Sequence, residues 1–194
     1  MRTKAFVWIG VFILSALGVN AQENEWQRLL NLLQKEAAYF EGQKGYITDL
    51  KSKYNSFSLE ELSVTDSQIV MAYRMRDRFG NEASEQYLEE TVLWQPAFPI
   101  VAAEICYNYS FTFESFPEAL FLQIRFPEEL PFAYHLVSIY KDLKTTKETK
   151  SYLTDTTTRI IMPIRRKNRE KIFKAIDDYQ RKTLMETLKL KGEY

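Results

Sequence analysis

The sequence of 194 residues is poor in the side chains that most metal and redox chemistry needs. It has one cysteine, one histidine and six glycines. A single cysteine excludes an internal disulfide framework and a thiolate zinc site, and a single histidine excludes sites built from several imidazoles. No calcium-loop motif is present, and the glycines do not form a phosphate-binding loop. The sequence therefore predicts no metal and no cofactor.

The overall charge and composition are those of an ordinary globular protein. The 26 basic residues balance the 26 acidic residues, so nothing in the charge points to a nucleic-acid partner. Aromatic residues make up 14% of the chain, which excludes wholesale disorder because that much apolar surface collapses. We expect a single domain with a sizeable core.

The N-terminal segment has the layout of a secretory signal peptide. Arg2 and Lys4 form a short positive region, and an uncharged, mostly apolar run follows over residues 5–19. A short stretch ending in Ala21 then suits signal peptidase just before Gln22. The apolar run is shorter than the roughly 20 residues that a spanning helix needs. An uncleaved membrane anchor is the alternative interpretation.

These observations predict the organisation and the location of the protein. We expect a signal peptide over residues 1–21 and one globular domain over 22–194, with cleavage between Ala21 and Gln22. The short positive region and the disulfide-free, glycine-poor remainder favour a bacterial host. The protein is then periplasmic or secreted, and no transmembrane segment remains after cleavage.

Apolar periodicity predicts both helices and strands. Apolar residues at three- and four-residue spacing, or helix-forming composition, indicate helices over 25–40, 46–54, 82–93 and 168–190. Alternation or β-branched composition indicates strands over 68–76, 104–113, 119–126, 133–142 and 156–164. Polar composition indicates loops over 55–67 and 144–150, and Pro163 would place its strand at a sheet edge.

The order of these elements predicts an α+β fold. We expect an antiparallel sheet of about four strands, with N-terminal helices and a long C-terminal helix packed on one face. A mostly helical bundle is the alternative, if the segments 68–76 and 119–142 form helices.

Catalysis has little support in the sequence. A nucleophilic pair would need Cys106 and His135, and no motif orients the imidazole or supplies an oxyanion hole. Adjacent carboxylates occur at 60–61, 89–90, 128–129 and 177–178. Adjacent residues in a helix or strand point in different directions, whereas a glycosidase needs two carboxyl groups facing each other. We predict that the protein is not an enzyme; a small envelope enzyme using carboxylates or the Cys106/His135 pair is the alternative.

Two groups of residues are candidates for binding. The first belongs to an aromatic-rich window and could stack on a sugar or an apolar ligand, unless it forms the core: Tyr107, Tyr109 and Phe111. The second is a basic cluster at the start of the C-terminal helix, where the helix dipole disfavours positive charge: Arg165, Arg166, Lys167 and Arg169. A solvated helix end is the other interpretation of this cluster.

The sequence thus predicts an exported, non-catalytic ligand- or protein-binding protein of the bacterial cell envelope. Its expected partner is an envelope protein, a glycan or an anionic surface. A structural subunit of an envelope assembly, with an aromatic sheet face packed against another protein, is a further alternative.

Overall fold

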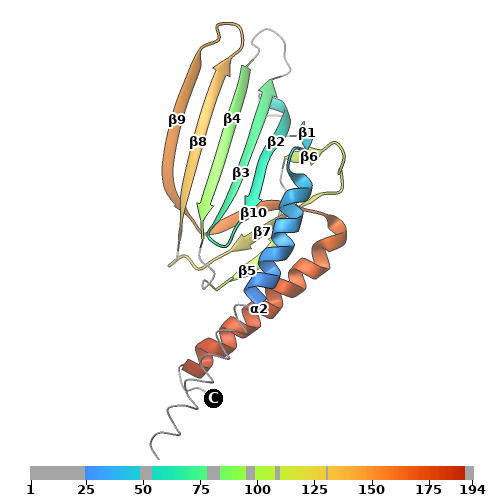
Figure 1. Ribbon diagram of the computed structural model, residues 1–194, viewed down its shortest axis with the longest axis vertical. Coiled ribbons are helices and arrows are strands. Elements are labelled where there is room, and N and C mark those ends of the chain that lie inside the picture. The colour runs from blue at the N-terminus through green and yellow to red at the C-terminus, as the bar shows by residue number, and fades with distance from the viewer. Residues whose placement is uncertain are drawn as a thin grey trace, which may run out of the picture.

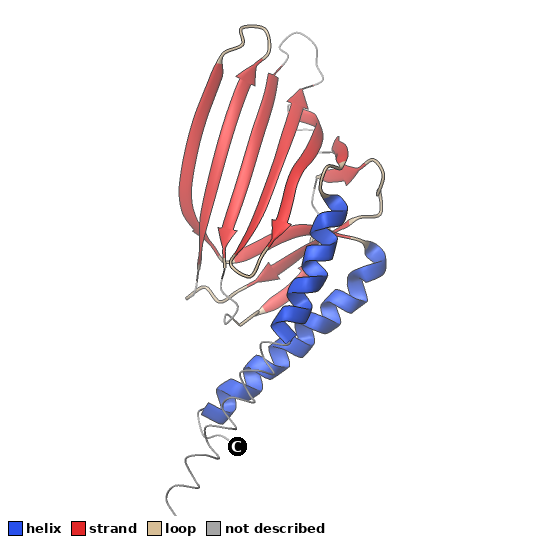
Figure 2. Cartoon of the chain, viewed as in Figure 1, coloured by secondary structure: helices blue, strands red, loops and turns tan. Residues whose placement is uncertain are grey.

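The protein is mostly β. The computed structural model describes residues 25–48, 54–77, 84–94, 99–107, 110–129 and 131–190. Among the described residues, strand residues outnumber helix residues, and the strands form two antiparallel sheets with two helices beside them (Figures 1 and 2). The prediction of an α+β fold with one sheet of about four strands is therefore wrong. The predicted signal peptide lies outside the described residues.

The larger sheet has seven strands in the order β6-β1-β2-β3-β4-β8-β9. Every neighbouring pair in it is antiparallel. Its strands are β1 Lys44–Ile47, β2 Tyr54–Val64, β3 Gln68–Asp77, β4 Ser84–Leu93, β6 Phe111–Phe113, β8 Phe132–Asp142 and β9 Glu148–Thr157. The short strand β6 forms one edge, and the ten-residue strand β9 forms the other.

The smaller sheet and the helices occupy the other end of the molecule (Figure 1). The small sheet has the order β10-β7-β5, with β5 Ala102–Ile105, β7 Leu120–Arg125 and β10 Arg159–Ile164. The helices are the N-terminal helix over residues 25–40 and α2 Arg169–Leu190, which follows a 3-10 turn, Arg166–Asn168. The pairs Glu25–Lys182 and Glu36–Arg165 join the helix ends in opposite order, so the two helices run antiparallel.

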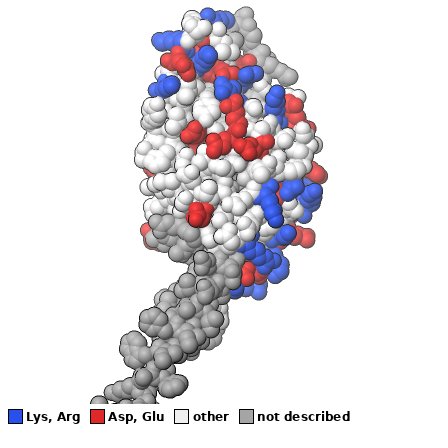
Figure 3. Space-filling view, in the orientation of Figure 1, with Lys and Arg blue, Asp and Glu red and all other residues white. Residues whose placement is uncertain are grey.

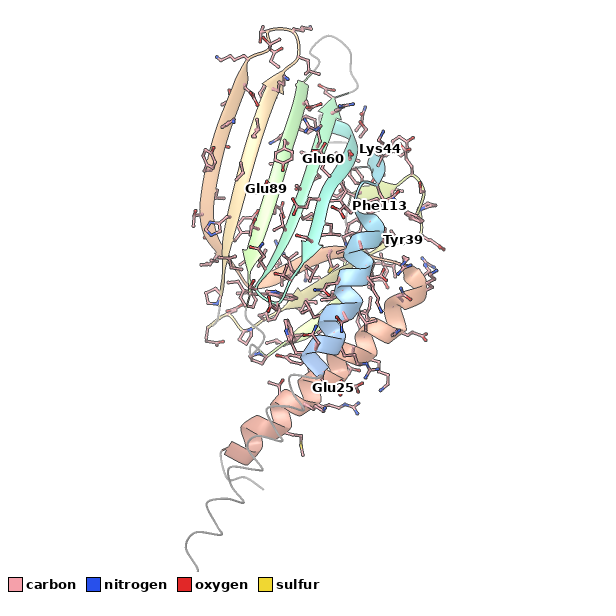
Figure 4. All side chains as sticks on the ribbon, viewed as in Figure 1. Glu25, Tyr39, Lys44, Glu60, Glu89 and Phe113 are labelled. Atoms are coloured by element: carbon pink, nitrogen blue, oxygen red, sulfur yellow. The ribbon has the colours of Figure 1, made fainter. Side chains whose placement is uncertain are left out.

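Large sheet, small sheet and helix pair pack as three layers around one core. Alternate residues of the small sheet point to its two sides. Leu122 and Met162 are completely buried on the side of the helices, whereas Phe121 and Pro163 lie against Tyr73 of the large sheet. The N-terminal helix also reaches the edge of the large sheet, where Phe40 packs on Phe113 with ring centroids 4.8 Å apart. Figure 4 labels Tyr39 and Phe113 near this junction.

The predicted loop over 55–67 is wrong for most of its length, and the predicted helix over 46–54 is wrong at its two ends, while residues 49–53 lie outside the described residues. Residues 44–47 form β1 and residues 54–64 form β2. Strand β2 has two irregularities in its pairing with β3, one near Tyr54 and one near Leu59. Each bulge adds a residue and shifts the alternation, so the buried positions follow spacings of three and two. The strand therefore lacks the period of two by which strands are recognised.

The predicted helix over 82–93 is also wrong, because residues 84–93 form β4. The segment is rich in glutamate, glutamine and leucine, which favour helices in isolation. Here β4 lies between β3 and β8 and pairs with both along its length. Pairing on both edges of the strand overrides the local preference.

The predicted strands over 104–113 and 156–164 each combine two strands of different sheets. The first spans the end of β5 and the whole of β6, and the second spans the end of β9 and the whole of β10. The remaining strand predictions match β3, β7 and β8, and the predicted helices over 25–40 and 168–190 are confirmed. Pro163 lies in β10, an edge strand of the small sheet, as predicted.

Candidate functional site

A cavity of about 340 Å³ lies between the two sheets. Residues of β3, β4 and β8, the end of β9 and the start of β10 line it. Its size is at the lower end of the range of small-molecule sites, about 300–1,000 Å³. Apolar side chains form much of its wall: Ile69, Met71, Val92, Ile160 and Ile161. Polar groups complete it: Glu90, Tyr134, Asp155, Thr156, Thr157 and Arg159.

Strand pairing brings these residues to one place. On the inner face of the large sheet, Met71 of β3 lies opposite Glu90 of β4, and Val92 of β4 lies opposite Tyr134 of β8. The chain then leaves the large sheet after β9 and enters the small sheet with β10, so the residues at this crossing form the other wall. The segment that connects the two sheets, from the end of β9 to the start of β10, therefore forms one wall of the cavity.

Glu90 is the acidic group inside the cavity. Its carboxylate accepts a hydrogen bond of 2.9 Å from the Tyr73 hydroxyl. Among the described residues, no lysine, arginine or histidine forms an ion pair with it. Burial raises the pKa of Glu90, and the Tyr73 hydrogen bond only partly opposes this effect. Burial and the nearby Glu90 charge raise the pKa of Tyr134 to about 12.

The rim of the cavity carries two opposite charges. Asp155, near the end of β9, and Arg159, the first residue of β10, are both exposed. The Thr157 hydroxyl accepts a hydrogen bond from the Arg159 amide at 3.2 Å and donates one to the Arg159 carbonyl at 3.0 Å. These two bonds fix the turn between the sheets and thereby the entrance to the cavity.

The unpaired charge of Glu90 should lower the stability of the ligand-free protein. Because its pKa is raised by folding, protonated Glu90 contributes stability that is present below its ordinary pKa of 4.5 and is lost as the pH rises through the raised value. We expect Glu90→Gln to raise the urea midpoint at pH 7.5 and to leave it nearly unchanged near pH 4. Equal urea midpoints of the wild-type protein and Glu90→Gln at both pH values would show that burial of the Glu90 carboxylate does not destabilise the protein.

The structure does not bring Cys106 and His135 together. His135 lies on β8 next to Tyr134, which lines the cavity, so His135 points to the opposite, outer face of the sheet. There its Nδ1 lies 3.3 Å from the Thr154 hydroxyl. Cys106 follows β5 in the small sheet, where its amide donates a hydrogen bond to the Phe121 carbonyl, and its side chain packs against the core. A catalytic dyad of these two residues is therefore not formed.

Two of the three residues of the predicted aromatic group, Tyr107 and Phe111, lie within the described residues. Tyr107 is 79% exposed in the turn after β5, and Tyr109 lies outside the described residues. Phe111 belongs to β6 and packs against Phe57 with ring centroids 4.7 Å apart. The interpretation of Phe111 as a core residue thus fits the structure better than a stacking platform.

The predicted basic cluster divides into two parts. Arg165 forms an ion pair of 2.8 Å with Glu36, a carboxylate that is only 1% exposed. Its guanidinium carbon also lies 4.1 Å from the centre of the Tyr39 ring. The other three members, Arg166, Lys167 and Arg169, are exposed, and basic side chains gather on this side of the molecule in Figure 3. Arg165 therefore has a structural role, and Arg166, Lys167 and Arg169 are the members whose side chains are exposed to solvent.

Acidic side chains gather on the outer face of the large sheet (Figures 3 and 4). Arg74 forms ion pairs with Glu60 and Glu85, and Glu85 also pairs with Arg76 at 2.9 Å. Glu89 accepts a hydrogen bond of 2.9 Å from the Tyr87 hydroxyl on this same face. The adjacent residues Glu89 and Glu90 thus point to opposite sides of the sheet and do not act on one substrate.

Glu90, Tyr134 and Arg159 are among the cavity residues that the sequence did not predict as site residues. With 84–93 taken as a helix, Glu90 belongs to a solvated doublet of acids. As part of a strand, it is the one acid between Leu88 and Val92 on a face that is otherwise apolar there. A single acid in such a face is the signal that could have identified it.

Within the described ranges, no cluster of three or more potential metal ligands occurs. Neither described helix has a stretch that is both long and apolar enough to cross a membrane. Comparisons with protein-family models, curated proteins and solved structures give no significant match.

Proposed function

We propose that the protein is an exported, non-catalytic binding protein of the bacterial cell envelope, and that it binds a small ligand in the cavity between its sheets. The observation that carries this proposal is the cavity itself. Among the described residues, five apolar side chains from the two sheets and six polar residues line it, and small-molecule sites combine an apolar wall with converging polar groups in this way.

The geometry gives the alternative of an enzyme less support. Cys106 follows β5 of the small sheet and packs against the core, whereas His135 points to the outer face of the large sheet. Glu89 and Glu90 point to opposite sides of the large sheet. Among the described residues, the carboxyl group in the interior of the cavity, that of Glu90, accepts its hydrogen bond from the Tyr73 hydroxyl and not from a serine, threonine or cysteine. The signal peptide predicted from the sequence supports export.

Native mass spectrometry of protein recovered from the host's extracytoplasmic fraction tests this function. We expect a chain beginning at Gln22 with a small-molecule adduct that organic solvent releases. Ile161→Trp should remove the adduct, because Ile161 lines the cavity and the larger ring would occupy it. Tyr152→Trp is the matched control, since Tyr152 is 73% exposed on β9. Absence of any adduct, or equal adducts in both variants, would contradict the proposal.

The second candidate is a structural subunit, and strand β9 favours it. This strand is an edge of the large sheet, is exposed along nearly all of its length, and carries the exposed apolar side chains Tyr152 and Leu153. Long exposed edge strands tend to pair with another chain. The same spectra distinguish the two functions, because a dimer or a protein complex without a small adduct supports the structural subunit.

A further inference from the structure

We propose that the cavity selects a ligand with an organic ammonium group on an apolar chain, and that the ammonium binds the Glu90 carboxylate. This inference rests on the proposed function, because it names the class of ligand for the same cavity. It is carried by the position of the Glu90 carboxylate among the apolar side chains that line the cavity from both sheets.

The charge of Glu90 is not compensated by the protein. Its partner is a neutral phenol, Tyr73, and a second phenol, Tyr134, lines the same space. No ion pair involving Glu90 occurs within the part of the chain that the structure describes. A partly buried carboxylate without a cation is costly, so a ligand that supplies the cation gains the attraction that the protein leaves unused.

The rim does not reverse this preference. Asp155 and Arg159 carry opposite charges and are both exposed, so their fields largely cancel and are screened by water. A ligand carboxylate could pair with Arg159 at the entrance. The rest of such a ligand would then place no positive charge near Glu90, and a carboxylate that moved further inward would be repelled. The interior therefore disfavours anions and favours cations.

The walls determine the rest of the ligand. Ile69, Met71 and Val92 line the cavity from the large sheet, and Ile160 and Ile161 line it from the crossing strand. An alkyl or similar apolar chain between these two surfaces would bury its own area and theirs, at roughly 25 cal/mol per Å² of apolar surface. The volume of about 340 Å³ limits the ligand to a small molecule.

Three probes with the same chain separate charge from apolar burial: n-octylamine, 1-octanol and octanoate. Calorimetry at pH 7.5 on the full exported chain should give tightest binding for octylamine and weakest for octanoate. We expect the amine to bind at least about tenfold more tightly than the alcohol, because hydrogen bonds between charged groups are worth more than neutral ones.

Two substitutions at neighbouring positions locate the effect. Glu90→Gln retains an acceptor for Tyr73 and removes the charge, so the preference for octylamine over octanol should disappear. Glu89→Gln makes the same change one residue earlier, on the outer face of the same strand, and should keep the preference. Circular dichroism confirms that both variants are folded before binding is compared.

The outcomes separate this inference from the function on which it rests. If octylamine and octanol bind equally, or Glu90→Gln leaves the preference intact, the selection of an ammonium group is wrong while the cavity remains a ligand site. If octanoate binds most tightly, Arg159 directs recognition and the inference is overturned. If none of the three probes binds at its solubility limit, the ammonium inference fails. The native mass spectrometry of the protein from its host then shows whether the cavity holds a ligand of another class.

Discussion

Arg165→Ala should lower the free energy of unfolding by about 3–5 kcal/mol, the range for removal of one partner from a buried ion pair. Glu36 is almost completely buried, and its carboxylate receives hydrogen bonds from the Arg165 side chain, the Arg165 amide and the Asn168 side chain. The substitution leaves the carboxylate in place and removes its cation. Urea unfolding at pH 7.5 measures the loss.

The pH dependence of this loss identifies its cause. Burial would raise the pKa of Glu36, but the hydrogen bonds from Arg165 and Asn168 outweigh it and hold the pKa below its ordinary value. Glu36 therefore stabilises the native protein above its ordinary pKa, and this contribution is lost as the pH falls through the lowered value. Without Arg165, burial dominates and the pKa of Glu36 rises. The difference between the two proteins should shrink as the pH falls toward 4.

Arg166→Ala is the matched control for Arg165→Ala. Arg166 is the next residue, is exposed, and forms no ion pair with any residue that the structure describes. Its replacement should change stability by no more than about 0.5 kcal/mol. If the two variants are equally stable, or if the loss at Arg165 does not vary with pH, then the buried pair does not hold the helices together.

This pair also shows what a sequence can and cannot reveal about a charged run. The run beginning at Arg165 is visible as an unusual concentration of basic residues before a helix. Its first member reaches a carboxylate 129 positions earlier in the chain, on the N-terminal helix. Nothing local distinguishes Arg165 from Arg166, because the difference arises from the packing of two helices that are distant in sequence. Prediction from the sequence therefore identified the run and not the roles within it.

The same limit applies to the strands. The alternation in β3 is regular, with Ile69, Met71 and Met75 on the inner face, and the strand could be predicted from it. Bulges interrupt the alternation of β2, and the composition of β4 favours a helix, so both were missed. Both segments become strands because each has a partner on both sides. The candidate cavity depends on β4, which is why it could not be predicted from the sequence.

Gly45→Ala should destabilise the protein by roughly 3 kcal/mol, at the upper end of the range for overpacking in a core. Gly45 lies in β1 between Phe57 of β2 and Phe113 of β6. An added Cβ would overlap the main-chain carbonyl oxygen of Thr112 and lie within 2.7 Å of the Phe57 ring. A backbone oxygen cannot turn aside as a flexible side chain can, so β6 must move away from β1 or the Phe57 ring must leave its place.

Gly42→Ala, three residues earlier, provides the comparison. Gly42 has a φ of 75° and open space around its missing Cβ, so alanine there meets backbone strain of about 1 kcal/mol and no overlap. Hydrogen exchange separates the two effects. In Gly45→Ala the amides of Thr48 and Glu114, which bond across β1 and β6, should lose protection, and in Gly42→Ala they should keep it. Retained protection together with unchanged stability in Gly45→Ala would mean that the edge of the sheet has room for a side chain, and that its close packing does not require glycine.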